Sequence, residues 1–143
     1  MKHLSDYMEE KQTKLFTKHK VFFAFSPDQM TQGLEKTGQE VTDIVHMGGG
    51  MYAQKSTADA LVDDLERLVT MCIAHDVKEN GIDAVIAREL ANHEAYYTGD
   101  IDSTCEALEL YPTTREYILE RFYIEQKRES KEEEWQTQEQ HVY

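Results

Sequence analysis

Residues 41–72 carry the strongest pattern in the chain, and they read VTDIVHMGGGMYAQKSTADALVDDLERLVTMC. Short apolar runs stand on both sides of the three glycines at 48–50, and this arrangement predicts a β-hairpin. Ser56 or Thr57 can cap a helix, and apolar residues then recur at helical spacing from residue 58 to residue 79. A hairpin followed directly by a long amphipathic helix is typical of an α+β protein.

The residues before the hairpin predict two further helices and two strands. Apolar residues at helical spacing predict a first helix over residues 3–18, and the aromatic run 21–25 predicts a strand buried on both faces. Ser26, followed by Pro27, is a strong N-cap signal for a helix that ends near Gly38. The apolar residues of 41–47 predict the strand that enters the hairpin.

The residues after the long helix predict three more helices and a polar tail. Helical spacing covers residues 83–97, and capping-box patterns at Ser103 and Thr113 predict a short helix and a C-terminal helix. Beyond Glu125 the sequence is polar on all sides apart from Trp135, so residues 126–143 are expected to be a frayed helix or disordered. We expect a single helix-dominated α+β domain over residues 1–125, with a small, mostly antiparallel sheet of about three strands.

The charge of the chain is concentrated in its middle third. The 143 residues carry a net charge of −13, and residues 59–110 hold thirteen acidic and three basic side chains, a net of −10. A negative field of this size repels nucleic acid and anionic membranes, and it suits a basic protein surface. With no apolar run of membrane-spanning length and no secretory signal, we expect a cytoplasmic protein with reduced cysteines and no membrane contact.

No catalytic or metal-binding motif is complete. The glycines at 48–50 precede an apparent strand rather than the helix that a phosphate-binding loop needs. Residues 100–104, DIDST, match the letters of an aspartate-nucleophile phosphatase, but a turn precedes them instead of a buried strand. Cys72, His75, His93 and Cys105 are zinc-type ligands at a non-standard spacing, and Cys72 is in phase with the apolar stripe of its helix. We expect no cofactor and favour a protein without enzymatic activity.

One polar cluster leaves an alternative open. Its members lie close together in the sequence near a predicted helix end, and they are His93, Glu94, Tyr97 and Asp100. Such a cluster can form a buried hydrogen-bonded junction, or it can bind a small ligand. The alternative function is therefore a small-molecule or metal-binding protein, with hydrolysis as one form of that activity.

Two short strings resemble those of known proteins. Residues 22–26, FFAFS, with Gln29 and Gly33, form the first, and residues 92–94, NHE, with residues 97–100, YTGD, form the second. With the hairpin between them, they resemble small acidic proteins, without assigned activity, that bacteriophages and mobile elements carry. The resemblance covers about residues 20–110 and implies an intracellular protein that binds a host factor, including a defence system. No site residue carries over from it.

The hypothesis is therefore a binding protein that docks on a basic surface through its acidic middle segment. The resemblance makes a host nucleic-acid-binding or defence protein the natural partner, which the chain would inhibit, while direct nucleic-acid binding is not expected. Oligomerisation is a further possibility. The residues predicted to contact the partner are Asp59, Asp63, Asp64 and Glu66.

Overall fold

The computed structural model describes residues 1–141, and contacts group the chain into two compact units. The N-terminal unit is Lys2–Cys72, and the C-terminal unit runs from Ile73 onward. Helix α3 (Ala58–Asn80) begins in the first unit and ends in the second. The chain thus divides inside the range 1–125 that the sequence predicts as one domain. None of the described helices is both long and apolar enough to cross a membrane.

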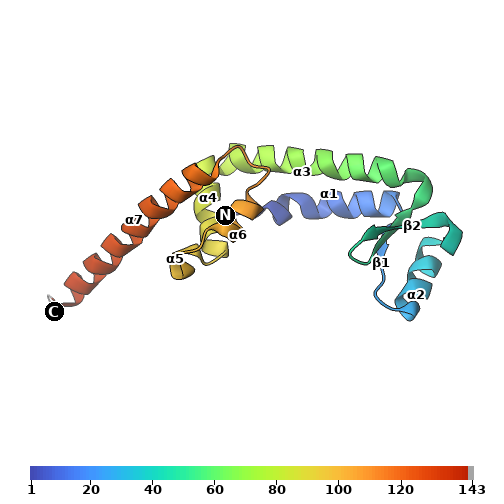
Figure 1. Cartoon of the computed structure of the whole chain (residues 1–143), viewed down its shortest axis with the longest axis horizontal. Helices are drawn as coiled ribbons and strands as arrows, with labels where there is room; N and C mark the ends of the chain where they lie inside the picture. The colour runs from blue at the N-terminus through green and yellow to red at the C-terminus, as the bar shows by residue number, and fades with distance from the viewer. Residues whose placement is uncertain (142–143) are drawn as a thin grey trace. The chain divides into compact units, whose positions relative to one another are not determined.

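A three-stranded antiparallel sheet lies in the N-terminal unit (Figure 1). Its strands are β1 (Phe22–Phe23), β2 (Ile44–Gly48) and β3 (Met51–Gln54), in the order β1-β3-β2. With helices forming most of the described chain, this sheet confirms the predicted helix-dominated α+β class.

The glycine hairpin is confirmed. Gly48, Gly49 and Gly50 all have positive φ, between 55° and 99°, which only glycine adopts at no steric cost. Across the sheet, Tyr52 stacks on Phe22 on one side and on His46 on the other, at ring distances of 5.5 and 4.8 Å. These cross-strand ring pairs fix the register of the three short strands.

Two helices complete the N-terminal side of this unit, α1 (Leu4–Lys18) and α2 (Pro27–Thr37). The N-cap prediction for α2 is confirmed, because Ser26 Oγ accepts a hydrogen bond from the Gln29 backbone N–H at 3.2 Å. Helix α2 packs its Gly33 against the ring of Phe22, so closely that an added Cβ would lie 2.1 Å from the ring. This approach fixes α2 on the sheet.

The strand predicted over residues 21–25 is wrong in its extent and burial. Strand β1 has two residues, and Phe23 and Phe25 are 50% and 75% exposed. The reason is that only one face of this extended run is buried: Phe22, which packs on Gly33 of α2, and Ala24 are 8% and 7% exposed, and the residues that alternate with them stay open to solvent. The strand predicted over residues 41–47 also begins later, at Ile44, because residues 41–43 form a 3₁₀ turn, η1 (Val41–Asp43).

The C-terminal unit contains α4 (Ile82–Asn92), α5 (Ala95–Thr98), α6 (Asp102–Ala107) and α7 (Arg115–His141). The single helix predicted over residues 83–97 is wrong, because Glu94 adopts a left-handed conformation with φ of 54° and ends the helical path. Helix α6 begins one residue before the predicted cap at Ser103. The C-terminal helix is confirmed, with Thr114 rather than Thr113 capping it through the Tyr117 N–H.

Helix α7 continues through most of the segment predicted as a polar tail. Phe122 near its start is buried and stacks on Tyr96 at 5.7 Å, and none of the described side chains after it is buried. Ion pairs of Glu125 with Arg121 and Arg128, at 2.7 and 4.0 Å, join successive turns. The segment is therefore helical from residue 126 to residue 141, and residues 142–143 lie outside the described residues.

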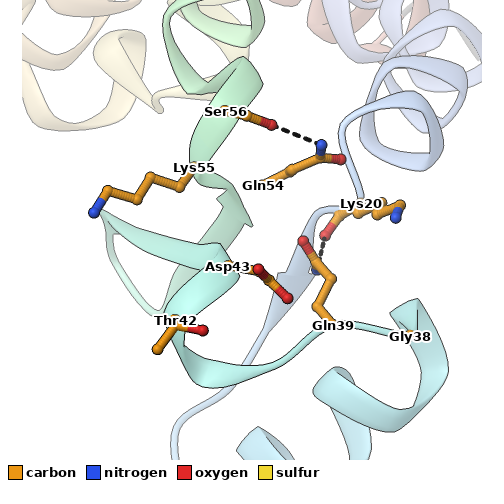
Figure 2. Close-up of a pocket in the computed structure, with 8 residues that line it drawn as sticks. All are labelled: Lys20, Gly38, Gln39, Thr42, Asp43, Gln54, Lys55 and Ser56. Atoms are coloured by element: carbon orange, nitrogen blue, oxygen red, sulfur yellow. Dashed lines mark hydrogen bonds between the residues drawn. The ribbon is translucent and has the colours of Figure 1, made fainter.

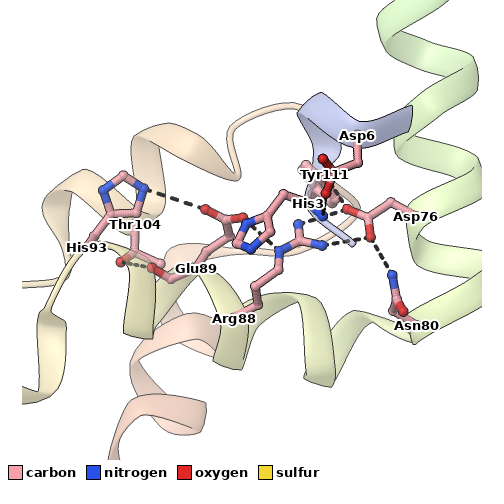
Figure 3. A network of polar contacts seen from close by, with 9 residues as sticks. All are labelled: His3, Asp6, Asp76, Asn80, Arg88, Glu89, His93, Thr104 and Tyr111. Carbon is pink, nitrogen blue, oxygen red and sulfur yellow. Dashed lines mark hydrogen bonds and ion pairs between the residues drawn. The ribbon is translucent and has the colours of Figure 1, made fainter. Parts of the chain in front are cut away.

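A buried ion pair connects two helices of the C-terminal unit (Figure 3). The carboxylate of Asp76 on α3 is 0% exposed and accepts two hydrogen bonds from the guanidinium of Arg88 on α4, at 2.8 and 2.9 Å. It also accepts bonds from Tyr111 Oη at 2.6 Å and from Asn80 Nδ2 at 2.8 Å. One carboxylate thus joins α3, α4 and the segment that follows α6.

The hydrogen bonds keep this pair charged. Burial alone would raise the pKa of Asp76, but hydrogen bonds from Arg88, Tyr111 and Asn80 outweigh it and lower the pKa below its ordinary value. The bond to Asp76 raises the pKa of Arg88, and burial raises the pKa of Tyr111. Because the folded state lowers the pKa of Asp76, its stabilisation is present above the unfolded pKa of about 3.9 and is lost as the pH falls through the folded value.

We expect Arg88→Met to lower the free energy of unfolding by about 3–5 kcal/mol at neutral pH, because Asp76 is left buried and unpaired. The double variant Asp76→Leu, Arg88→Met should lose less than that single variant, since no lone charge remains. It should also lose less stability than the native chain on acidification. Urea unfolding at several pH values measures these differences, and a double variant less stable than Arg88→Met would contradict the assignment.

Candidate protein-interaction face

The first part of α3, within the N-terminal unit, presents an exposed acidic face. Asp59, Asp63 and Glu66 are exposed, and their spacing of four and three residues places them on one side of the helix. Val62, between them, is 41% exposed. We call these four residues the α3 acidic face.

The three carboxylates of the α3 acidic face are not neutralised within the part of the chain that the structure describes. None of them forms an ion pair there, although Arg67, also exposed, lies beside them. Asp63 and Glu66 border a shallow hollow of about 560 Å³ that ends at Met71, which is 56% exposed. The face therefore combines free negative charge with exposed apolar surface.

Asp64 does not belong to this face, although the sequence grouped it with the other three. Its side chain is 24% exposed, and Oδ2 lies 3.0 Å from Nε2 of His19 and 3.6 Å from Nζ of Lys18. The hydrogen bond to His19 is the largest influence on the carboxyl of Asp64, and it lowers the pKa. Asp64 therefore ties the end of α1 to α3.

The structure adds His19, which the sequence reasoning missed. The ring is 2% exposed, and its second nitrogen, Nδ1, lies 3.0 Å from the hydroxyl of Thr57. Its backbone carbonyl accepts a hydrogen bond from the Gln54 N–H at 3.0 Å. His19 thus connects α1, β3 and α3. In the sequence, only its position directly after a predicted helix could have indicated this role.

The alternative cluster does not assemble into a site. Tyr97 is 93% exposed, and Asp100 accepts a hydrogen bond from the Asp102 N–H at 2.9 Å, which closes a local turn. His93 lies 3.5 Å from a carboxylate oxygen of Glu89 (Figure 3), and Glu94 occupies the left-handed break after α4. The four side chains thus serve local contacts or face outward, and none of them lines the four hollows bordered by Gln39, Glu66, His75 and Phe25.

The described residues contain no group of three or more histidine, cysteine or acidic side chains that could hold a metal ion. Cys72 is 4% exposed, and its thiol lies 3.5 Å from the carbonyl oxygen of Tyr7 in the N-terminal unit. Burial raises the pKa of this thiol, as for a core residue rather than a metal ligand.

The acidic middle segment does not form one free patch. Its carboxylates fall in both units, and several of those in the C-terminal unit have basic partners. Asp76 and Glu89 bind Arg88, and Asp102 lies 2.6 Å from Arg115. In the N-terminal unit, the α3 acidic face remains as free negative charge.

We expect Asp63→Asn to leave the melting temperature nearly unchanged and Asp64→Asn to lower it, because only Asp64 holds the buried His19 ring. The contribution of Asp64 should vanish on acidification, since its folded pKa is lowered. Thermal unfolding of the two variants at neutral and acidic pH measures this. Equal melting temperatures at neutral pH would contradict the separate roles.

Comparison with known proteins identifies a family but no activity. A family model described as a family of unknown function (DUF7659) matches residues 4–137. No curated protein matches the chain. No solved structure matches it.

Proposed function

The chain belongs to this family of unknown function, and we propose that it is a non-enzymatic binding protein whose α3 acidic face docks on a basic protein surface. One observation carries the proposal: three carboxylates stand exposed on one side of a helix without an ion pair in the described chain. A partner that supplies lysine or arginine side chains would neutralise them.

Geometry and charge support this kind of partner. Residues three or four apart on a helix have Cβ atoms about 5–6 Å apart, so neighbouring carboxylates at this spacing raise the local negative potential together. Val62 and Met71, exposed beside them, offer apolar area that binding would bury. The charged groups then increase the association rate and select the partner, while the apolar side chains add affinity.

The proposed partner is a nucleic-acid-binding protein of the same cell, including a defence protein of the host of a bacteriophage or mobile element. Such a protein offers a basic surface, and occupying that surface would exclude DNA or RNA. The resemblance of residues 20–110 to small acidic phage proteins supports this choice. A cytoplasmic location belongs to the same proposal.

A neutralised face tests the proposal. The variant Asp59→Asn, Asp63→Asn, Glu66→Gln should associate with the partner about tenfold more slowly, because loss of interface charges acts mainly on the association rate. The matched control is Glu9→Gln, Asp28→Asn, Glu35→Gln, which removes three exposed charges elsewhere in the same unit. Both variants change the net charge equally, so a difference between them reports the position of the charges.

The measurement has two stages. Each protein is first used to capture partners from nuclease-treated lysate of the source cell, and a captured protein is then purified for association kinetics at low and high salt. If the proposal is right, high salt weakens binding, the control variant still binds, and nucleic acid competes with the chain for the partner. Equal capture by the two variants, or binding indifferent to salt, would refute it.

A further inference from the structure

The N-terminal unit contains a polar hollow that the proposed docking function does not use. It has a volume of about 480 Å³, within the range of small-molecule sites, and its lining comes from three segments. Lys20 follows α1, Gln39 and Asp43 lie between α2 and β2, and Gln54 and Lys55 lie where β3 ends (Figure 2). The α3 acidic face contributes none of the lining residues.

Gln39 presents a buried acceptor without a partner to this hollow. Its side chain is 8% exposed, and Nε2 donates to the carbonyl of Lys20 at 3.2 Å and to the hydroxyl of Thr37 at 2.8 Å. The Thr37 hydroxyl already donates to the carbonyl of Gly33, so it can only accept from Gln39. The amide orientation is therefore fixed, and Oε1 has no hydrogen-bond partner.

A buried oxygen in this state is costly unless something donates to it. Two more acceptors share the hollow with it. Asp43 accepts the Glu40 N–H with Oδ2 at 2.9 Å, which leaves Oδ1 for a ligand. Gln54 donates its Nε2 to Ser56 at 2.8 Å, which leaves Oε1 as the second acceptor. In Figure 2 the side chains of Gln39 and Asp43 reach the middle of the view, and Gln54 lies above them. The hollow therefore fits a molecule with several O–H or N–H donors.

The rim of the hollow selects for an anion. Lys20 and Lys55 lie at its two edges (Figure 2), and neither ammonium group forms an ion pair within the described part of the chain. With Asp43 as the single acidic group of the lining, the two lysines leave the hollow with a net positive charge. A cationic ligand is therefore disfavoured, although the centre is rich in acceptors.

We propose that this hollow binds a small phosphorylated molecule with free hydroxyl groups, of the ribose-phosphate type found in sugar phosphates and nucleotides. The hydroxyl groups donate to Gln39 Oε1 and to the carboxylate of Asp43, as carboxylates do when they bind a ribose diol. The phosphate lies at the Lys20 edge of the rim, where the flexible side chain of Lys20 pairs with it, and Lys55 adds positive charge from the other edge.

Lys20 provides a variant that removes a charge without loss of the fold. Its backbone has a φ of 53°, a left-handed conformation that glycine adopts more readily than lysine. The two backbone hydrogen bonds at this residue, to Thr17 and from Gln39, do not need its side chain. The variant Lys20→Gly should therefore fold as well as the native chain and lack one ammonium group of the rim.

The test is a titration of the ¹⁵N-labelled full chain with ribose 5-phosphate, followed by NMR. The side-chain amide of Gln39 reports directly on its own oxygen, so its signals should shift and saturate together with those of Asp43 and Lys55. Ribose and inorganic sulfate should each bind at least about tenfold more weakly, because one lacks the anion and the other lacks the donors. Adenosine monophosphate, as a second probe, distinguishes a nucleotide from a sugar phosphate as the ligand. Binding tighter than that of ribose 5-phosphate indicates a nucleotide, and equal binding indicates a sugar phosphate.

Matched variants complete the test. Lys20→Gly should weaken ribose 5-phosphate binding about tenfold, the loss expected for one charge-assisted contact, while Lys36→Gln, an equal charge change outside the hollow, should not weaken it. An unmoved Gln39 amide, sulfate that binds as well as ribose 5-phosphate, or equal weakening by both variants would overturn the proposal. Failure of this site would leave the docking proposal untouched, since the two share no residue.

Discussion

The C-terminal unit depends on keeping the carboxylate of Asp76 charged in a place that water does not reach. A lone buried carboxylate would be unstable there, and four hydrogen bonds from Arg88, Tyr111 and Asn80 compensate for the lost hydration. Asp76 and Asn80 lie on α3, Arg88 lies on α4, and Tyr111 follows α6, so satisfying one charge fixes the relative positions of these three segments. Val85, Ile86 and Leu90, on the same helix as Arg88, are 0% exposed.

The N-terminal unit solves a different problem, since its sheet is too small to be stable alone. Stacked rings of Phe22, Tyr52 and His46 cross the three strands, and the contact of Phe22 with Gly33 holds α2 against them. His19 then joins the end of α1 to β3 and α3. These contacts are made inside the unit, which leaves the α3 acidic face and the polar hollow available for other molecules.

Local patterns predicted the elements whose cause is local. The glycines at 48–50 supply the backbone angles of a tight hairpin, and Ser26 with Pro27 begins a helix whatever surrounds it. Predictions that depended on surroundings were wrong: the run 21–25 looked buried on both faces, and residues 83–97 looked like one helix. Only one face of β1 is buried, where Phe22 packs on α2, and Glu94 turns the chain so that Tyr96 of α5 stacks on Phe122 of α7.

The sequence by itself determined the α+β class, the hairpin, the long central helix and the negative charge. The elements follow from the spacing of residues that are near neighbours in the chain, and the charge follows from composition. Only the tertiary structure decided which carboxylates are free. Asp63 and Asp64 are adjacent and chemically identical, yet Asp63 faces water and Asp64 holds His19, since consecutive residues on a helix point about 100° apart. Which partners a charge meets depends on segments that folding brings together, and no local pattern encodes that.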